Sequence, residues 1–214
     1  RASKRFPLTG VGDVNTYGLF AELFLDLQAK TGMAGIILPT GILSDDTSKV
    51  FFQELINSER LISAKSFENE EFIFSGLPNV IRFSLLTLSG INNSGPQTSF
   101  VFYIRRIEQL SETERFFELD PDDFKQISPN TQTCPVFRSK KDVELTKIFY
   151  KRFPILMDEG KGQDGNPWGI RFMRMFDMAN DSNLFKTFDQ LEKTRAKFHG
   201  VNWVDTSGEI FVPL

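Results

Sequence analysis

The sequence has a single cysteine, Cys134, and a single histidine, His199. A disulfide needs two cysteines, a thiolate zinc site needs several, and a Ser-His-Asp triad needs an oriented histidine. His199 lies beside Gly200 near the end of the chain, where the sequence indicates no orienting partner. Disulfides are therefore excluded, and neither a metal site nor a His-based triad is expected. Cys134, directly before Pro135, is interpreted as a packed small residue rather than a nucleophile.

Long hydrophobic runs are also lacking. No segment approaches the ~18 apolar residues that a bilayer-spanning helix requires. The first five residues, RASKR, have no apolar core of the kind found in signal peptides. Together with the low cysteine content, this favours a cytoplasmic protein without a membrane partner. The absence of an initial methionine suggests a piece of a longer polypeptide.

A strong charge of one sign is missing as well. Lys and Arg number 25 against 28 Asp and Glu, giving a formal net charge of -3. Any contact with nucleic acid therefore requires a local basic patch. Arg82, Arg138, Lys140 and Lys141 are candidates for such a patch if the fold brings them together. An ordinary solvated charge pattern is the alternative interpretation.

Tyrosine and tryptophan are scarce beside phenylalanine, with 3 Tyr and 2 Trp against 23 Phe. Most of these rings are expected in the core. Phe72 and Phe74 differ because they lie between two β-rich runs, away from a clear helical or strand period. A ring at the edge of a sheet can stack on a base that has left the duplex. Burial in the core remains the commoner role for an aromatic side chain.

What the sequence does contain is an alternation of helical and strand patterns. Residues 32–41 (GMAGIILPTG) predict a buried strand over 34–38 that ends in a turn. A helical pattern over 15–27 precedes this strand and another, ending near residue 57, follows it, as in an α/β sheet. Residues 80–88 and 99–107 are β-rich and flank a turn cluster, which predicts an antiparallel hairpin at the sheet edge.

Shorter pieces follow residue 110. A soft boundary at 129–131 predicts one domain over residues 1–128 and a mixed α+β lobe over 129–214. Within that lobe the patterns predict a helix over 142–153 and another over 183–197. The apolar stretch 170–178 predicts a strand or a buried segment.

Several segments, taken in order, resemble the second half of large adenine-N6 DNA methyltransferases of type IIG-like restriction-modification and phage-defence systems. The first three are residues 12–22 (GDVNTYGLFAE), 35–41 (GIILPTG) and 82–88 (RFSLLTL). The remaining segments resemble the part that follows the catalytic domain, and they are 129–131 (PNT), 134–139 (CPVFRS), 166–168 (NPW) and 176–182 (FDMANDS).

The resemblance implies a partial Rossmann-like methyltransferase sheet, built from its late strands, and a segment that leads toward target recognition. The family's cofactor-binding glycine loop and Asn-Pro-Pro-aromatic loop are both missing from this chain. The parent enzyme would use S-adenosylmethionine and act on double-stranded DNA, with the rest of the methyltransferase domain as a partner. This chain alone would be inactive.

The resemblance also assigns roles to the two rings. Phe74 falls where the family places the aromatic that stacks on the flipped adenine, and Phe72 is the fallback. A non-catalytic DNA-binding or assembly module of a defence complex is the alternative function.

Overall fold

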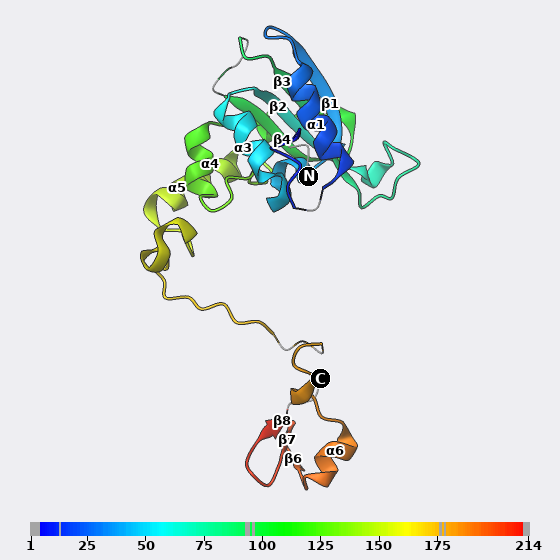
Figure 1. The fold of residues 1–214 in the computed structure, drawn as a ribbon, viewed down its shortest axis with the longest axis vertical. Helices are drawn as coiled ribbons and strands as arrows, with labels where there is room; N and C mark the ends of the chain where they lie inside the picture. The colour runs from blue at the N-terminus through cyan, green and yellow to red at the C-terminus, as the bar shows by residue number, and fades with distance from the viewer. Residues whose placement is uncertain are drawn as a thin grey trace. The chain divides into compact units, whose positions relative to one another are not determined.

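The computed structural model describes residues 5–12, 14–92, 95, 97–175, 177 and 179–211. The chain forms two compact units, Arg1–Ile170 and Arg171–Leu214 (Figure 1). Residues 129–170 thus belong to the first unit. The functional division predicted after residue 128, into a catalytic half and a lobe leading to target recognition, stays a prediction.

The first unit is built on a five-stranded mixed sheet with the strand order β1-β3-β2-β4-β5. β3 is antiparallel to both β1 and β2, and β4 is parallel to β2, so β1, β2 and β4 run in one direction. This confirms the predicted α/β class and the predicted strand over 34–38. The strands are β1 (Met33–Pro39), β2 (Leu61–Glu68), β3 (Arg82–Ser89), β4 (Thr98–Ile104) and β5 (Phe117–Leu119).

The predicted hairpin between residues 80–88 and 99–107 is wrong. β2 lies between β3 and β4, and β3 pairs with β2, for example Phe83 opposite Phe67. A turn-rich linker is compatible with either pairing, so the turn cluster did not decide between them. The two strands are both largely buried, and each pairs with another strand on both of its edges. Neither β3 nor β4 is therefore at the edge of the sheet.

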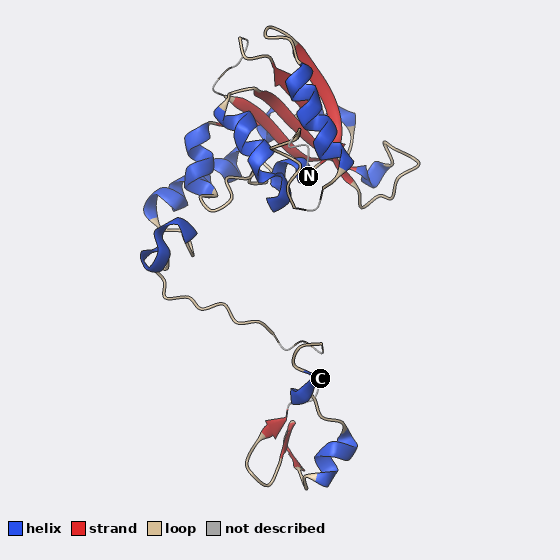
Figure 2. Ribbon diagram, in the orientation of Figure 1, coloured by secondary structure: helices blue, strands red, loops and turns tan. Residues whose placement is uncertain are grey.

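Helices cover one face of this sheet (Figure 2). They include α1 (Thr16–Leu27), the short α2 (Gly41–Ser44) and α3 (Lys49–Asn57). Four apolar side chains of α3 recur at helical spacing and are at most 5% exposed, which anchors the helix on the sheet; they are Phe51, Phe52, Leu55 and Ile56. At the end of α1, the Gln28 side-chain amide donates to the carbonyl of Leu88 at 2.8 Å and so ties the helix to β3. We refer to this covered side as the helix face.

The opposite face is only partly covered. A small cluster of Phe67, Phe83, Val101 and Ile104 packs there beneath the 3-10 helices η3 (Ile107–Ser111) and η4 (Thr113–Arg115). Near β1 this face is open, with Met33 60% and Ile37 56% exposed. β1 is also an edge strand of this sheet. Sheets with parallel strands are usually covered on both faces, so β1 presents an apolar surface that the described residues leave uncovered.

Two further helices, α4 (Pro121–Ile127) and α5 (Lys140–Arg152), complete the first unit together with the 3-10 helix η5 (Glu159–Gly165). Asp120 caps α4, because its side chain accepts from the backbone N–H groups of Asp122 and Asp123. Ser139 caps α5 in the same way through Asp142. The predicted helix over 142–153 is confirmed, and it begins two residues earlier.

The second unit has a three-stranded antiparallel sheet, β6 (Lys197–His199), β7 (Asn202–Val204) and β8 (Ile210–Phe211), with the helices η6 (Ser182–Leu184) and α6 (Phe188–Lys193). The helix predicted over 183–197 is confirmed only within α6. The strand or buried segment predicted over 170–178 is wrong for 170–175, where Phe172, Met173 and Met175 are 72–87% exposed, and residues 176 and 178 of this prediction lie outside the described residues. The apolar pattern predicted burial, but none of the described strands pairs with residues 170–175.

Replacing a ring at the junction of α3 and α4 tests this core. Phe52 is 0% exposed and meets Phe124 edge-to-face at 5.3 Å. Phe52→Ala should lower the free energy of unfolding by about 3–5 kcal/mol, because it removes buried contacts and leaves a cavity. Phe20, on α1 and 56% exposed, is the matched control, and Phe20→Ala should cost under about 1 kcal/mol. Urea denaturation of both variants measures the difference, and equal losses would contradict this core assignment.

Candidate functional site

The carboxyl ends of the parallel strands β1, β2 and β4 meet at one edge of the sheet. Ligands of open α/β sheets commonly bind outside this edge. A cavity of ≈ 290 Å³ lies there, and its walls include Thr40, Ser66, Glu68, Arg82 and Tyr103. These side chains follow or end the three parallel strands, or begin the antiparallel one.

Three hydroxyl groups form a hydrogen-bonded chain, and two of them, on Thr40 and Ser66, line the cavity. Thr40 Oγ1 lies 3.0 Å from Ser66 Oγ and 3.0 Å from Ser84 Oγ. Ser66 and Ser84 are opposite each other in the β2–β3 register and are at most 4% exposed. The Thr40 backbone N–H donates to the Arg82 carbonyl at 3.1 Å, which holds the turn after β1 against β3. A buried polar group without a partner is costly, and this chain of hydrogen bonds gives each of the three hydroxyls at least one partner.

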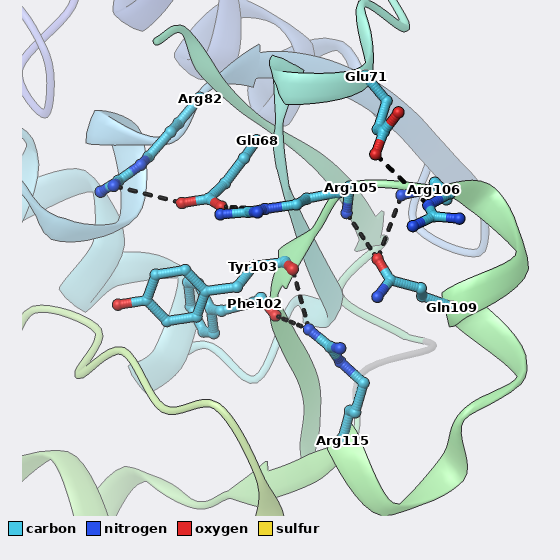
Figure 3. A network of polar contacts seen from close by, with 9 residues as sticks. All are labelled: Glu68, Glu71, Arg82, Phe102, Tyr103, Arg105, Arg106, Gln109 and Arg115. Carbon is cyan, nitrogen blue, oxygen red and sulfur yellow. Dashed lines mark hydrogen bonds and ion pairs between the residues drawn. The ribbon is translucent and has the colours of Figure 1, made fainter. Parts of the chain in front are cut away.

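A buried carboxylate organises the cationic side chains at the same edge (Figure 3). Glu68 is 8% exposed, and its two oxygens contact the guanidinium groups of Arg105 at 2.9 Å and Arg82 at 3.3 Å. The hydrogen bond to Glu68, followed by the attraction of its charge, raises the pKa of Arg105. One carboxylate therefore compensates part of the charge of two arginines. Nearby, Arg106 lies 3.6 Å from Glu71.

The end of β4 carries a bulge. The β2–β4 register advances from Lys65 opposite Val101 to Phe67 opposite Ile104, so β4 has one extra residue. Tyr103 is at φ 60°, a left-handed conformation that costs a tyrosine about 1–3 kcal/mol. Arg115 donates to the carbonyls of Phe102 at 3.3 Å and Tyr103 at 2.9 Å and so holds the bulge (Figure 3). The bulge places Phe102 and Tyr103 on the helix face, where Tyr103 lines the cavity.

The segment between β2 and β3 projects from this edge of the sheet (Figure 1). It begins with the 3-10 helix η2 (Asn69–Glu71), and Asn69 itself is 0% exposed. The Asn69 side-chain amide donates to the carbonyls of Phe74, Leu77 and Pro78 at 3.0–3.3 Å. Its oxygen accepts from the Phe74 N–H at 2.9 Å. One buried amide thus fixes the path of the loop.

The two predicted rings lie on this loop. Phe74 is 39% exposed and meets Phe83 edge-to-face at 4.8 Å. Phe72 is 55% exposed and is held at φ 50°. Phe74 is therefore packed on one side and open on another, whereas Phe72 is mostly free. The stacking role of either ring stays a prediction.

The predicted basic residues divide into two groups. Arg82 is paired with Glu68, whereas Arg138, Lys140 and Lys141 are exposed and have no carboxylate partner in the described part of the chain. Arg82 and Arg138 approach the same ring, with guanidinium carbons 6.0 Å and 4.5 Å from the centre of Tyr103. The two lysines are the first residues of α5, and the N-cap Ser139 separates them from Arg138.

The structure does not bring all predicted residues to one place. Phe74 packs on Phe83, whose neighbour Ser84 belongs to the hydroxyl chain of the cavity. Because adjacent strand residues point to opposite faces, Phe74 contacts one face of the sheet, whereas Arg138 lies against Tyr103, which lines the cavity on the other face.

Sequence reasoning missed the hydroxyl chain, the bulge and the role of Glu68. One signal was available in the sequence, because Ser84 interrupts an apolar run between Phe83 and Leu85. A polar residue buried within a strand must find a partner, and that requirement points to a polar site.

Cys134 and His199 lie elsewhere. Cys134 is 4% exposed, and burial raises the pKa of its thiol well above its usual range. His199 is exposed in β6. In the described ranges, no three His, Cys, Asp or Glu side chains gather as a metal site would require. The helices of these ranges include none that is long and apolar enough to cross a bilayer.

No protein-family model matches the sequence, and no curated protein is similar to it. Some solved structures resemble part of the chain. The type IIG restriction endonuclease BpuSI aligns with 55% of this chain and 15% of its own, with a TM-score of 0.44 and 16% identity. A modification subunit of a putative type I restriction enzyme from Vibrio vulnificus YJ016 aligns with 61% and 34%, at a TM-score of 0.42 and 13% identity.

A type I restriction-modification methyltransferase subunit from Streptococcus thermophilus aligns with 72% of this chain and 28% of its own, at a TM-score of 0.37 and 16% identity. The chain thus spans between 15% and 34% of the length of these three proteins. The matches are partial, and all are at low identity.

Removing the Asn69 amide should loosen the loop that carries Phe72 and Phe74. Asn69→Ala leaves three carbonyls and the Phe74 N–H without their partner, which should cost about 1–3 kcal/mol locally. Hydrogen exchange at Phe74 and its neighbours should become faster, while exchange in β2 and β3 changes little. Glu70→Ala, an exposed change in the same loop, is the control. Unchanged protection at Phe74 would show that other contacts hold the loop.

The burial of Cys134 predicts an unreactive thiol. Iodoacetamide should alkylate it at least about tenfold more slowly in the folded chain than in denaturant, because both access and thiolate formation are suppressed. Mass spectrometry of timed samples measures this rate. Equal rates in the two states would contradict the burial of Cys134.

Proposed function

We propose that this chain is the later part of the catalytic domain of an S-adenosylmethionine-dependent adenine-N6 DNA methyltransferase. The parent protein would belong to a restriction-modification or phage-defence system. The observation that carries this proposal is the position of Phe74, half-exposed on an amide-anchored loop at the carboxyl end of β2. The ordered sequence resemblance over the chain supports it.

Phe74 would hold one face of an adenine that has left the duplex. Its ring rests edge-on against Phe83, so its orientation is set before a base arrives. The Asn69 amide fixes the backbone at the same residue. A positioned ring loses little freedom on binding, and stacking on an aromatic side chain contributes about 1–3 kcal/mol per base.

The basic residues would contact phosphates to different extents. Arg138, Lys140 and Lys141 are exposed without a carboxylate partner in the described ranges, so their charge is available to an anion. Arg82 shares Glu68 with Arg105 and would contribute less. Exposed, uncompensated cations are the groups that neutralise DNA phosphates.

The rest of the catalytic domain would cover β1. This strand is an edge of its sheet and leaves Met33 and Ile37 more than half exposed. An additional strand would satisfy the free backbone groups of β1, and a helix would cover the open face. Both additions would complete a sheet of which this chain holds the later strands.

The residues of this chain do not fit the cofactor site by themselves. Gly10 and Gly12 precede α1, but no strand leads into them in the described residues 5–12, so the expected strand–loop–helix arrangement is not found there. S-adenosylmethionine, which supplies the methyl group, would be bound by the rest of the domain. Phe74 and the basic residues would only position the DNA.

The stacking role predicts a specific loss of activity. In the parent protein, Phe74→Ala should lower kcat/KM for adenine methylation by about 5- to 150-fold, the equivalent of one lost stacking interaction. Phe72→Ala should have a smaller effect, because Phe72 has no ring partner in the structure's described part. Transfer of radiolabelled methyl groups to DNA measures the rates, and thermal unfolding measures the stability of each variant. Parallel losses of activity and stability in Phe74→Ala would assign this ring to the core.

The 214-residue chain alone should transfer no methyl groups and should bind S-adenosylmethionine weakly or not at all. Isothermal titration of the cofactor and a methylation assay on adenine-containing DNA check both expectations. Clear turnover or tight binding by this chain would overturn the assignment as a partial catalytic domain. A non-catalytic DNA-binding or assembly module would predict a parent protein that binds DNA without methylating it.

A further inference from the structure

The cavity at the carboxyl edge is separate from the ring proposed to hold the target base. Its wall contains Thr40 and Ser66, which lie on the helix face of the sheet. Phe74 packs on Phe83, on the opposite face, and is not part of this wall. The cavity is therefore a second candidate binding site.

One hydroxyl proton of the hydroxyl chain is not used in its two internal hydrogen bonds. Thr40, Ser66 and Ser84 have three hydroxyl protons between them, and their two mutual hydrogen bonds use two. Thr40 and Ser66 line the cavity and Ser84 does not, so a ligand acceptor in the cavity would favour the orientation of the two hydrogen bonds that leaves the third proton on Thr40 or Ser66. The cavity wall thus offers at least one hydrogen-bond donor.

Glu68 offers the complementary acceptor. Each carboxylate oxygen has two lone pairs, and each receives one guanidinium contact, from Arg82 or from Arg105. Glu68 lines the cavity, so its remaining lone pairs can accept hydrogen bonds from a ligand bound there. A donor and an acceptor on neighbouring walls match the edge of a nucleobase.

An aromatic ring and an uncompensated cation complete the arrangement. Tyr103, which the bulge places on the helix face, contributes its side chain to the cavity. Arg138 lies over this ring at 4.5 Å, exposed and without a carboxylate partner in the described ranges. Arg138 is not part of the cavity wall, but from its position against Tyr103 its guanidinium can bind a phosphate attached to the group inside the cavity.

We propose that this cavity binds a nucleotide, with the base edge on the Thr40–Ser66 hydroxyls and Glu68 and the phosphate on Arg138. The volume of ≈ 290 Å³ is sufficient for one base. This site goes beyond the proposed methyltransferase role and does not depend on it, because it uses neither Phe74 nor the cofactor.

Titration of the 214-residue chain with 2′-deoxyadenosine 5′-monophosphate tests this site, followed by calorimetry or ligand-observed NMR. Thr40→Val removes the central hydroxyl while keeping the side-chain shape, and it should weaken binding about tenfold. Thr87→Val is the matched control, because Thr87 Oγ1 pairs with Ser63 Oγ at 3.1 Å on the opposite face of the same strands. It should leave binding unchanged.

The phosphate contact has its own variant. Arg138→Gln is an exposed change that should fold normally, and it should weaken the nucleotide about tenfold while leaving 2′-deoxyadenosine unaffected. Inorganic phosphate alone should bind far more weakly than the nucleotide. If Thr40→Val fails to fold, Ser66→Ala replaces it.

Three results would overturn the site: no binding of the nucleotide, equal effects of Thr40→Val and Thr87→Val, or an Arg138→Gln effect that is the same for nucleoside and nucleotide. Phe74→Ala should leave nucleotide binding intact. A failed nucleotide titration and a failed methylation test are therefore distinguishable.

Discussion

The insertion of β3 between β1 and β2 is the constraint on which the rest of the first unit depends. β3 is antiparallel to both neighbours, so β1 and β2 become parallel to each other, and β4 continues that direction. As a result three carboxyl ends reach one edge, and the start of β3 reaches the same edge with Arg82. The cavity, the ion network around Glu68 and the loop bearing Phe74 all lie at that edge.

The buried carboxylate of Glu68 determines which arginine side chains remain available to bind an anion. Glu68 is fixed at the end of β2, where a charge is costly unless it is paired, and Arg82 and Arg105 supply that pairing. Arg138 lies close to the same ring as Arg82 but has no such partner within the described residues. Arg82 and Arg138 were both predicted as basic candidates from the sequence, but only Arg138 has its charge free for an anion.

The elements with strong local signals were predictable from the sequence. The apolar run flanked by glycines predicts β1, and the helical spacing of apolar residues predicts α1 and α3, which cover one face of the sheet. Both patterns are recognisable because each depends only on residues that are close together in the sequence. The pairing of β3 with β2 was not predictable in this way. It depends on which strands are buried on both sides, and that is a property of the whole sheet. The bulge at Tyr103 was equally hidden, because it arises from a register shift against β2 and from the hydrogen bonds of Arg115, twelve residues away in the chain.

The candidate site shows the same division. Phe72 and Phe74 could be selected because their loop lacks a regular period, and the structure places both at the sheet edge. The hydroxyls of Thr40, Ser66 and Ser84 could not be grouped, because they come from three strand ends brought together only by the sheet.

The carboxyl edge of the sheet has two faces with different side chains. One presents a ring held by Phe83 and a buried amide, and the other presents a polar cavity beside Tyr103. A ring that is open on one side suits a base approaching from outside the sheet, whereas paired donors and acceptors suit a base edge that enters a cavity. Because neither Phe74 nor Phe83 belongs to the cavity wall, a base stacked on Phe74 would leave the cavity free.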